Sequence, residues 1–423
     1  MLNVLFRFRK LVFSRTAKDT SIILVGNSVA SFLAIAFTIL AARYLGPADW
    51  GTVAAVISFV IIVEAIGDLG LGSSLFRFVS ADWSNNNKEK VSSTMSLIFL
   101  IRLATAIILF AVLIAGSAFF TKIIFKSDEP LLVVFGALSV FAYLLLEFQI
   151  VALQAKHSWV LASFFTAFTN LLRLFMVVAL VFLDKVSVLS ILAVFSGSPL
   201  VIFFVTLGWQ RTSLRLPANW KLAAKNIIPF SGWLGVNRIA GSIIARLDVL
   251  LLLSFLGAYQ TGIFAAAKQL AIGVPMIVGS MAVAIAPRLA ILEKEALVLY
   301  FKKAVLLSVL ITIGLGVGIL LTPYIVQLFG PQYSSSTPVL QLLLLGYVPF
   351  VLSMPAVNLL IYSLGKPQVV AIISLVQLPV VYVSYLLIIP LFGLWGAAAI
   401  NGVWQLSTMI FGYFFAMYYI RQK

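Results

Sequence analysis

Charged side chains interrupt several long apolar stretches of this chain, where a charge is costly unless it has a partner or a water-filled cavity. Arg238, Ser242 and Arg246 are spaced four residues apart, which places them in one polar stripe along a helix. Lys268 lies in the next apolar stretch. At 1.5 Å per residue, Arg238 and Lys268 lie about 16 Å and about 15 Å from the ends of their stretches. Two cations at one depth suggest a site for an anion such as a pyrophosphate.

Other intramembrane arginines either add to this group of cations or pair with acids. Arg43 and Arg246 lie toward the same predicted side, so they could continue a cationic track for a passing anion. Arg173 fits such a track and a structural role equally well. The alternative reading is that each arginine neutralises an acid on a neighbouring helix. We favour that reading for Arg102, which lies at a depth similar to that of Glu64 and Asp68.

The acids have their own candidate roles. Glu64 and Asp68 are one helical turn apart and face the same way, so they could couple transport to an ion or serve a structural purpose. Asp248 has the same two candidate roles, although it lies about 200° around a helix from Arg246 and cannot pair with it. We expect Asp248 to orient a turn or a neighbour. The glycines at positions 67, 70 and 72 predict a bent or broken helix beside Asp68.

The composition decides which elements carry these charges. The chain is 62% hydrophobic and 10% charged, with a mean hydropathy of +1.13, whereas about a quarter of the residues of a soluble domain are charged. Apolar stretches exceed the roughly 20 residues that a helix needs to cross a bilayer. The pattern predicts an all-α polytopic membrane protein, with kinks at Pro199, Pro275, Pro349, Pro355 and Pro379. The predicted spans are 20–43, 51–80, 92–120, 131–153, 158–183, 186–208, 227–254, 258–286, 303–328, 338–363, 367–390 and 394–419.

The basic residues are divided unequally between the two sides of these spans. The net charge is +16, and most basic residues fall in the two tails and the even-numbered loops. The odd-numbered loops hold only Arg43, Lys122, Lys126 and Lys185. The positive-inside rule therefore predicts cytoplasmic termini and accounts for the charge without a nucleic-acid partner. The basic N-terminal tail, residues 1–19, either lies on the inner membrane surface or is free.

A turn recurs at half the length of the chain. "RYLGPADWG" (43–51) and "SFLGAYQTG" (254–262) are 211 residues apart, each after the first span of a six-span half. The identical pairs are Leu45/Leu256, Gly46/Gly257, Gly51/Gly262, Ala54/Ala265 and Ala55/Ala266. We therefore predict two pseudo-symmetric lobes, 20–208 and 227–423, joined by a cytoplasmic linker at 209–226, around a central cavity. Arg43 does not recur, so it is not part of the shared turn.

Four stretches carry a resemblance to a known family. "ARYLGPADWGTVAAV", "GDLGLGSSLFRFVS", "RLDVLLLLSFLGAYQTGIFAAAKQL" and "LFGPQYSSSTPVLQLLLL" look like the polysaccharide-export, or O-antigen (Wzx-type), flippases. These belong to the multidrug/oligosaccharidyl-lipid/polysaccharide exporter superfamily. The resemblance implies a MATE-like fold of about 12 transmembrane helices. It also implies alternating-access export of an undecaprenyl-pyrophosphate-linked oligosaccharide for surface polysaccharides such as lipopolysaccharide. A bacterial or archaeal cytoplasmic membrane follows, with a polymerase and glycosyltransferases as possible partners.

Two other classes remain as alternatives. A multidrug or cation antiporter of the same fold would need buried acids, whereas the intramembrane charge here is slightly basic. A membrane glycosyltransferase or polymerase would need acids in a large outer loop, and only the adjacent Asp128 and Glu129 occur in such a loop. There is no phosphate-binding Gly-rich loop, no cysteine and a single histidine, His157, so we expect no enzyme activity, cofactor or metal site.

Overall fold

The computed structural model describes residues 15–210, 220–276, 278 and 294–422, and every regular element in these ranges is a helix. Nine of the helices in this part of the chain are long and apolar enough to cross a membrane. Three of the nine, Val25–Asp68, Ile227–Met276 and Gln368–Ile420, are 44 to 53 residues long and hold two spans each. The predicted all-α architecture of about twelve spans is therefore confirmed. Three predicted segments lie partly outside the described residues: the tail at 1–14, the linker at 211–219 and the eighth span at 279–286.

The helices follow the order of the predicted spans. The elements of the first half are α2 (Arg15–Asp68), α3 (Leu71–Ser84), α4 (Lys88–Ala115), α5 (Ser117–Phe120), the π-helix η1 (Thr121–Phe125), α6 (Leu131–Ala155), α7 (Trp159–Phe182) and α8 (Val188–Gln210). Those of the second half are α9 (Trp220–Ala271), α11 (Lys294–Val326), the 3-10 turns η2 (Gln327–Phe329) and η3 (Pro331–Tyr333), α12 (Ser336–Asn358), the π-helix η4 (Leu359–Ser363) and α13 (Pro367–Gln422).

Three of the long helices change direction at a glycine. Gly46 in α2 (φ 75°, ψ 171°) and Gly257 in α9 (φ 79°, ψ 177°) adopt nearly the same non-helical conformation, and Gly393 breaks α13. Side chains rarely adopt a positive φ, whereas glycine does so at little cost. The recurring turn predicted from the sequence is therefore present twice with the same backbone geometry.

The predicted break beside Asp68 is also present. Helix α2 ends at Asp68 and α3 begins at Leu71, with positive φ at Leu69 (51°) and Gly70 (74°) between them. Helix α8 continues through Pro199, α12 through Pro349 and Pro355, and α13 through Pro379. Pro275 lies after the end of α9, beyond a turn at residue 272. Membrane helices tolerate proline where neighbouring groups satisfy the freed carbonyl.

The chain forms two compact units. Unit 1 comprises Met1–Thr38 and Phe59–Ile239, and unit 2 comprises Ile39–Ser58 and Ala240–Lys423. The lobes expected from the sequence differ from these units in two places. Residues 39–58, around the first glycine turn, belong with the second half, whereas the first part of α9 belongs with the first half.

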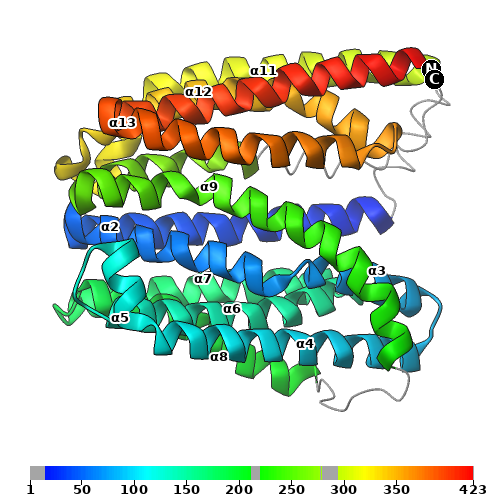
Figure 1. The fold of residues 1–423 in the computed structure, drawn as a ribbon, viewed down its shortest axis with the longest axis horizontal. Helices are drawn as coiled ribbons and strands as arrows, with labels where there is room; N and C mark the ends of the chain where they lie inside the picture. The colour runs from blue at the N-terminus through cyan, green and yellow to red at the C-terminus, as the bar shows by residue number, and fades with distance from the viewer. Residues whose placement is uncertain (1–14, 211–219, 277, 279–293, 423) are drawn as a thin grey trace. The chain divides into compact units, whose positions relative to one another are not determined.

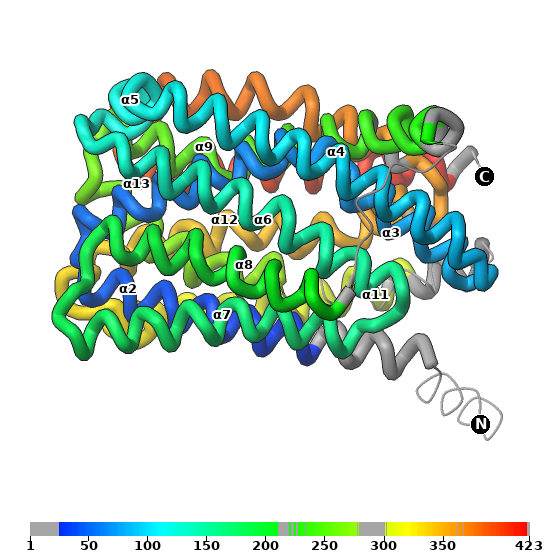
Figure 2. Tube along the Cα trace, turned by 90° about the horizontal axis from the view of Figure 1, so that it is seen from below, coloured from blue at the N-terminus to red at the C-terminus, as the bar shows by residue number. Residues whose placement is uncertain are grey.

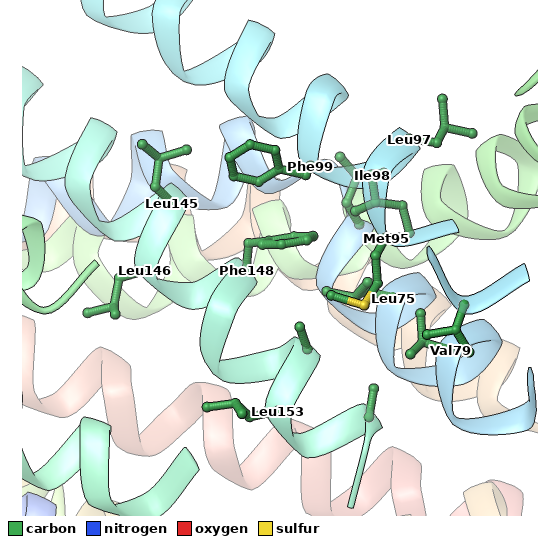
Figure 3. Close-up of a cluster of buried hydrophobic side chains, with 14 of the residues drawn as sticks. Leu75, Val79, Met95, Leu97, Ile98, Phe99, Leu145, Leu146, Phe148 and Leu153 are labelled. Atoms are coloured by element: carbon green, nitrogen blue, oxygen red, sulfur yellow. The ribbon is translucent and has the colours of Figure 1, made fainter. Parts of the chain in front are cut away.

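Unit 1 has a hydrophobic core built by α3, α4, α6 and their neighbours. Helix α6 packs against both α4 and α8, and these helices run side by side (Figures 1 and 2). Leu75 of α3, Ile98 and Phe99 of α4 and Phe148 of α6 meet in this core (Figure 3). The rings of Phe99 and Phe148 lie 5.0 Å apart between centroids. Because Arg102 follows Phe99 by one turn and Glu147 precedes Phe148, this packing also positions two charged side chains.

Unit 2 is built mainly from α11, α12 and α13, and α13 doubles back on itself (Figure 1). Gln377 joins the two halves of α13. It accepts a hydrogen bond from Trp404 Nε1 (2.8 Å) and donates to the hydroxyls of Ser407 (2.6 Å) and Thr408 (3.0 Å). Such polar contacts hold membrane helices together where lipid offers no competing hydrogen bonds.

Candidate functional site

Five charged side chains of unit 1 form what we call the acid-rich cluster. Arg238 of α9 contacts Glu64 (Nη2–Oε1, 3.0 Å), Glu147 (Nη2–Oε1, 2.9 Å) and Asp68 (Nη1–Oδ2, 3.2 Å). Arg102 of α4 contacts Asp68 and lies 3.4 Å from Glu147. The pairing of Arg102 with Asp68 was expected, whereas Glu64 binds Arg238 instead. The cluster holds three carboxylates and two guanidinium groups, so its formal charge is −1.

The broken helix shapes this cluster. Asp68 is the last residue of α2, and its Oδ1 accepts a hydrogen bond from the amide of Gly72 in the first turn of α3 (3.1 Å). A carboxylate stabilises the exposed amides at a helix N-terminus. Asp68 and Arg102 are fully buried, whereas the side chain of Arg238 is 34% exposed. Glu64 and Glu147 both contact Nη2 of Arg238, so these two carboxylates share one guanidinium group.

A second group of charges lies in unit 2. Lys268 Nζ contacts Asp248 (Oδ2 at 2.5 Å, Oδ1 at 2.6 Å) and the carbonyl oxygen of Ala245 at 2.7 Å. Asp248 also accepts a hydrogen bond from the amide of Val249 (2.8 Å). Arg246 is half-buried and lies close enough to interact electrostatically with Asp248 and Lys268. Arg246, Lys268 and Asp248 form what we call the cation-rich cluster, whose formal charge is +1.

Arg173 has a different environment in unit 1. Its Nε donates to Ser198 (2.8 Å), its Nη1 donates to Asn170 (3.2 Å), and its Nη2 contacts the hydroxyl of Tyr143. The guanidinium carbon lies 4.5 Å from the ring centre of Phe195. Among the described residues Arg173 has no acidic partner, so neutral dipoles and aromatic faces stabilise this buried charge.

Arg43 lies beside the first glycine turn, and its side chain is exposed. Its backbone carbonyl accepts a hydrogen bond from Gln332 Nε2 (3.1 Å). The structure thus brings Arg238 together with Glu64 and Asp68, and Lys268 together with Asp248. Arg238 belongs to unit 1, whereas Arg246, Lys268 and Arg43 belong to unit 2.

Sequence reasoning missed two parts of this arrangement. The first is Glu147, to which the sequence pattern assigned no role, although it contacts both arginines of its cluster. The pairing of Asp248 with Lys268 had a signal in the sequence. Asp248 lies nine residues before Gly257 and Lys268 lies eleven residues after it, so a turn at Gly257 places them at similar depths.

Comparisons with known proteins show which family this chain belongs to. A family model described as polysaccharide biosynthesis protein matches residues 16–293. The chain belongs to this family. The resemblance found in the sequence is thereby confirmed. A comparison with curated proteins found no match.

Solved structures share the fold of this polysaccharide biosynthesis protein. An inward-facing multidrug resistance MATE transporter of the MOP superfamily matches 95% of this chain and 98% of its own, at 14% identity and a TM-score of 0.73. An outward-facing MATE transporter (96% and 95%, 14% identity, TM-score 0.68) and a MOP superfamily transporter from Pyrococcus furiosus (97% and 97%, 14% identity, TM-score 0.68) are also similar. The MATE-like fold is confirmed, and the chain is a multi-pass membrane protein.

The two clusters of this family member differ in what they can bind. In the acid-rich cluster every guanidinium group contacts a carboxylate, so an additional anion would have to displace one. In the cation-rich cluster, one carboxylate serves two cations, and Lys268 takes both of its oxygen atoms. The guanidinium of Arg246 is the group there that remains able to bind an anion.

Proposed function

We propose that this protein is a transporter and that it moves a polyprenyl-pyrophosphate-linked oligosaccharide, of the undecaprenyl class, from the cytoplasmic to the outer leaflet of the cytoplasmic membrane. The family supports a cargo used in polysaccharide biosynthesis, and the fold supports alternating access. The proposal also draws on the charge of the cation-rich cluster, because such a cargo carries its negative charge on the pyrophosphate.

Arg246 is the observation that carries the proposal. It lies within α9, is half-buried, and has no carboxylate within ion-pair distance among the described residues. A cation inside a membrane span without a paired acid is costly, and a bound anion would offset that cost. Lys268 beside it strengthens the positive potential without using the donors of Arg246.

The remaining arginines complete the proposed path. Arg43 is exposed near the first glycine turn, where it would meet the cargo at the outer end. The partly exposed Arg238 would meet the pyrophosphate on the cytoplasmic side, in exchange for a carboxylate of its cluster. Arg173 lies outside this path, since Ser198 and its other neutral partners already occupy its donors.

Transport by purified protein in sealed vesicles tests the proposal. The cargo is a fluorescent polyprenyl-pyrophosphate oligosaccharide, and its movement is read by an impermeant quencher. Arg246→Gln should lower the transport rate about tenfold, the effect of losing one charge-assisted hydrogen bond, whereas Arg246→Lys should retain most of the rate. Lys185→Gln, in an exposed loop, is the matched control. Absence of transport by the native protein, or equal rates for Arg246→Gln and Lys185→Gln, would contradict the proposal.

A cation antiporter is the second candidate, because the acid-rich cluster has a formal charge of −1. The same vesicles loaded with a cationic dye distinguish the two functions. The antiporter would be favoured by two results together. The native protein would transport the dye but not the pyrophosphate lipid, and Glu64→Gln would abolish the dye transport.

The proposed orientation has an independent test, since the chain contains no cysteine. A cysteine at Ser127, after η1, should react with an impermeant thiol reagent applied outside intact cells. A cysteine at Asn85, between α3 and α4, should react only after the membrane is opened. Asn85 is suited to this substitution because the neighbouring Asn86, unlike Asn85, has a positive φ. The reverse labelling pattern would place the termini outside.

A further inference from the structure

The two glycine turns of unit 2 meet in a reciprocal backbone contact. A Cβ atom on Gly51 would overlap the carbonyl oxygen of Ala258, and one on Gly262 would overlap the carbonyl oxygen of Pro47. Gly51 and Gly262 are 211 residues apart, and so are Pro47 and Ala258. Equivalent positions of the repeat therefore contact each other as two copies do across a twofold axis.

This crossing has no polar connection of its own. Thr52 donates to the carbonyl of Ala48 and Thr261 donates to that of Gly257, so both hydroxyls bond within their own helices. Among the described residues, no hydrogen bond or ion pair joins 47–52 to 257–262. Van der Waals contact between two backbones holds the crossing, and such a contact separates without leaving an unpaired polar group.

Proline creates a difference between the two turns. In a continuous helix the carbonyl of Arg43 would accept a hydrogen bond from the amide of residue 47, but Pro47 has no N–H group. The break at Gly46 falls between Arg43 and Pro47, as the break at Gly257 falls between Ser254 and Ala258. The two turns differ because Ala258 carries the N–H group that Pro47 lacks.

The segment Pro331–Ser336 supplies donors to both turns. Gln332 Nε2 donates to the carbonyl of Arg43 (3.1 Å), and the buried hydroxyl of Tyr333 donates to that of Ala42 (2.9 Å). On the other side of the crossing, Ser336 Oγ donates to the carbonyl of Ile263 (2.8 Å). This segment lies within "LFGPQYSSSTPVLQLLLL", to which the proposed cargo path assigns no role.

The hydroxyl of Tyr333 remains a donor at physiological pH. Burial, together with the nearby charge of Asp49, raises the pKa of Tyr333 well above its usual range. Titration of the tyrosine therefore does not break the hydrogen bond to Ala42 at physiological pH.

We propose that Pro331–Ser336 is a latch that holds the outer gate, the crossing of Gly51 and Gly262, closed. While its three hydrogen bonds are made, the latch joins the end of the first span to the start of the eighth. When they break, the crossing separates and cargo can leave toward the outer side. The latch rests on the transport function and the orientation proposed above, but not on the identity of the cargo.

A single cysteine at Ser242, half-buried on α9 between the cation-rich cluster and Arg238, reports the gate. The rate at which an impermeant maleimide labels it from outside sealed right-side-out vesicles measures how often the crossing opens. Tyr333→Phe should accelerate labelling about fivefold, the effect of one lost hydrogen bond. Adding Gln332→Ala and Ser336→Ala should accelerate it about a hundredfold if each bond contributes equally. Gly262→Ala should open the crossing even with the latch intact.

Matched variants guard against general loosening of the fold. Tyr324→Phe removes a hydroxyl from an exposed side chain of α11, Ser334→Ala removes one from an exposed serine of the latch, and Gly314→Ala adds a methyl group in open space. All three should label at the parental rate. If Tyr333→Phe and the triple variant are labelled no faster than these controls, the proposed latch is refuted. Because labelling needs no cargo, faster labelling in a protein that does not move the pyrophosphate lipid would refute the cargo and leave the latch intact.

Discussion

The acid-rich and cation-rich clusters both place charged side chains inside membrane spans, but they differ in the sign of their net charge. The first has three carboxylates for two guanidinium groups and the second has one carboxylate for two cations. In the first, Arg238 contacts all three carboxylates and Arg102 contacts two of them. In the second, the excess lies on Arg246, which no carboxylate contacts among the described residues. The two clusters therefore differ in whether a carboxylate or a cation is in excess.

Of the substitutions that test the two clusters, removal of Asp68 should cause the largest loss of stability. Asp68→Ala leaves Arg102 buried without its nearest carboxylate and removes the hydrogen bond to the start of α3. Loss of one partner of a buried ion pair typically costs about 3–5 kcal/mol. Thermal unfolding of the purified protein in detergent measures the loss. An unchanged unfolding temperature would show that the acid-rich cluster does not stabilise the fold.

Removing Asp248 should cost less. Asp248→Ala leaves Lys268 with the carbonyl of Ala245 and, unlike Asp68→Ala, removes no hydrogen bond to the start of a helix, so we expect a loss of about 3 kcal/mol, the lower end for one partner of a buried ion pair. Adding Lys268→Met removes the remaining charge and should restore most of the stability. If the double variant is less stable than Asp248→Ala, the lysine stabilises the protein by another route.

Substitutions at the two glutamates test how the carboxylates share the two arginines. Glu64→Gln weakens one contact, to Arg238, so it should lower the free energy of unfolding by about 1 kcal/mol. Glu147→Gln should cost more, because Glu147 contacts both arginines. Thermal unfolding in detergent measures both losses, and equal losses would show that the contact between Glu147 and Arg102 does not stabilise the protein.

An exposed ion pair provides the smallest expected effect. Lys122 and Asp128 lie 3.6 Å apart with side chains 70% and 90% exposed. Surface pairs of this kind contribute little because water screens them. Asp128→Ala should therefore leave the unfolding temperature unchanged within error, and a shift comparable to that of Asp248→Ala would undermine the distinction between buried and exposed pairs.

Much of the fold was predictable because the relevant signals are local. Apolar length predicted the spans, and the two Leu-Gly turns predicted the repeat. The glycines after Glu64 predicted the break at Leu69 and Gly70. The prolines did not mark helix ends in α8, α12 and α13, since proline requires a missing hydrogen bond to be satisfied but does not require the helix to end.

The sequence predicted which charged residues form the site but not which of them contact each other. The sequence located the charges inside the membrane and their approximate depths. It did not show that Arg238 would turn toward Glu64 and Glu147, because contacts across helices depend on how each helix is rotated and packed. Glu147 could have been grouped with Arg102 by depth, but depth alone does not choose among several acids.

The sequence by itself therefore determined the number of spans, the repeat, the glycine turns and the family, all of which follow from the length and local chemistry of single segments. The tertiary structure decided which charges are neutralised, and it decided that the carbonyl of Arg43, beside the turn in "RYLGPADWG", accepts a hydrogen bond from Gln332. Residues 43 and 332 are distant in sequence, and only packing brings a free acceptor to a free donor.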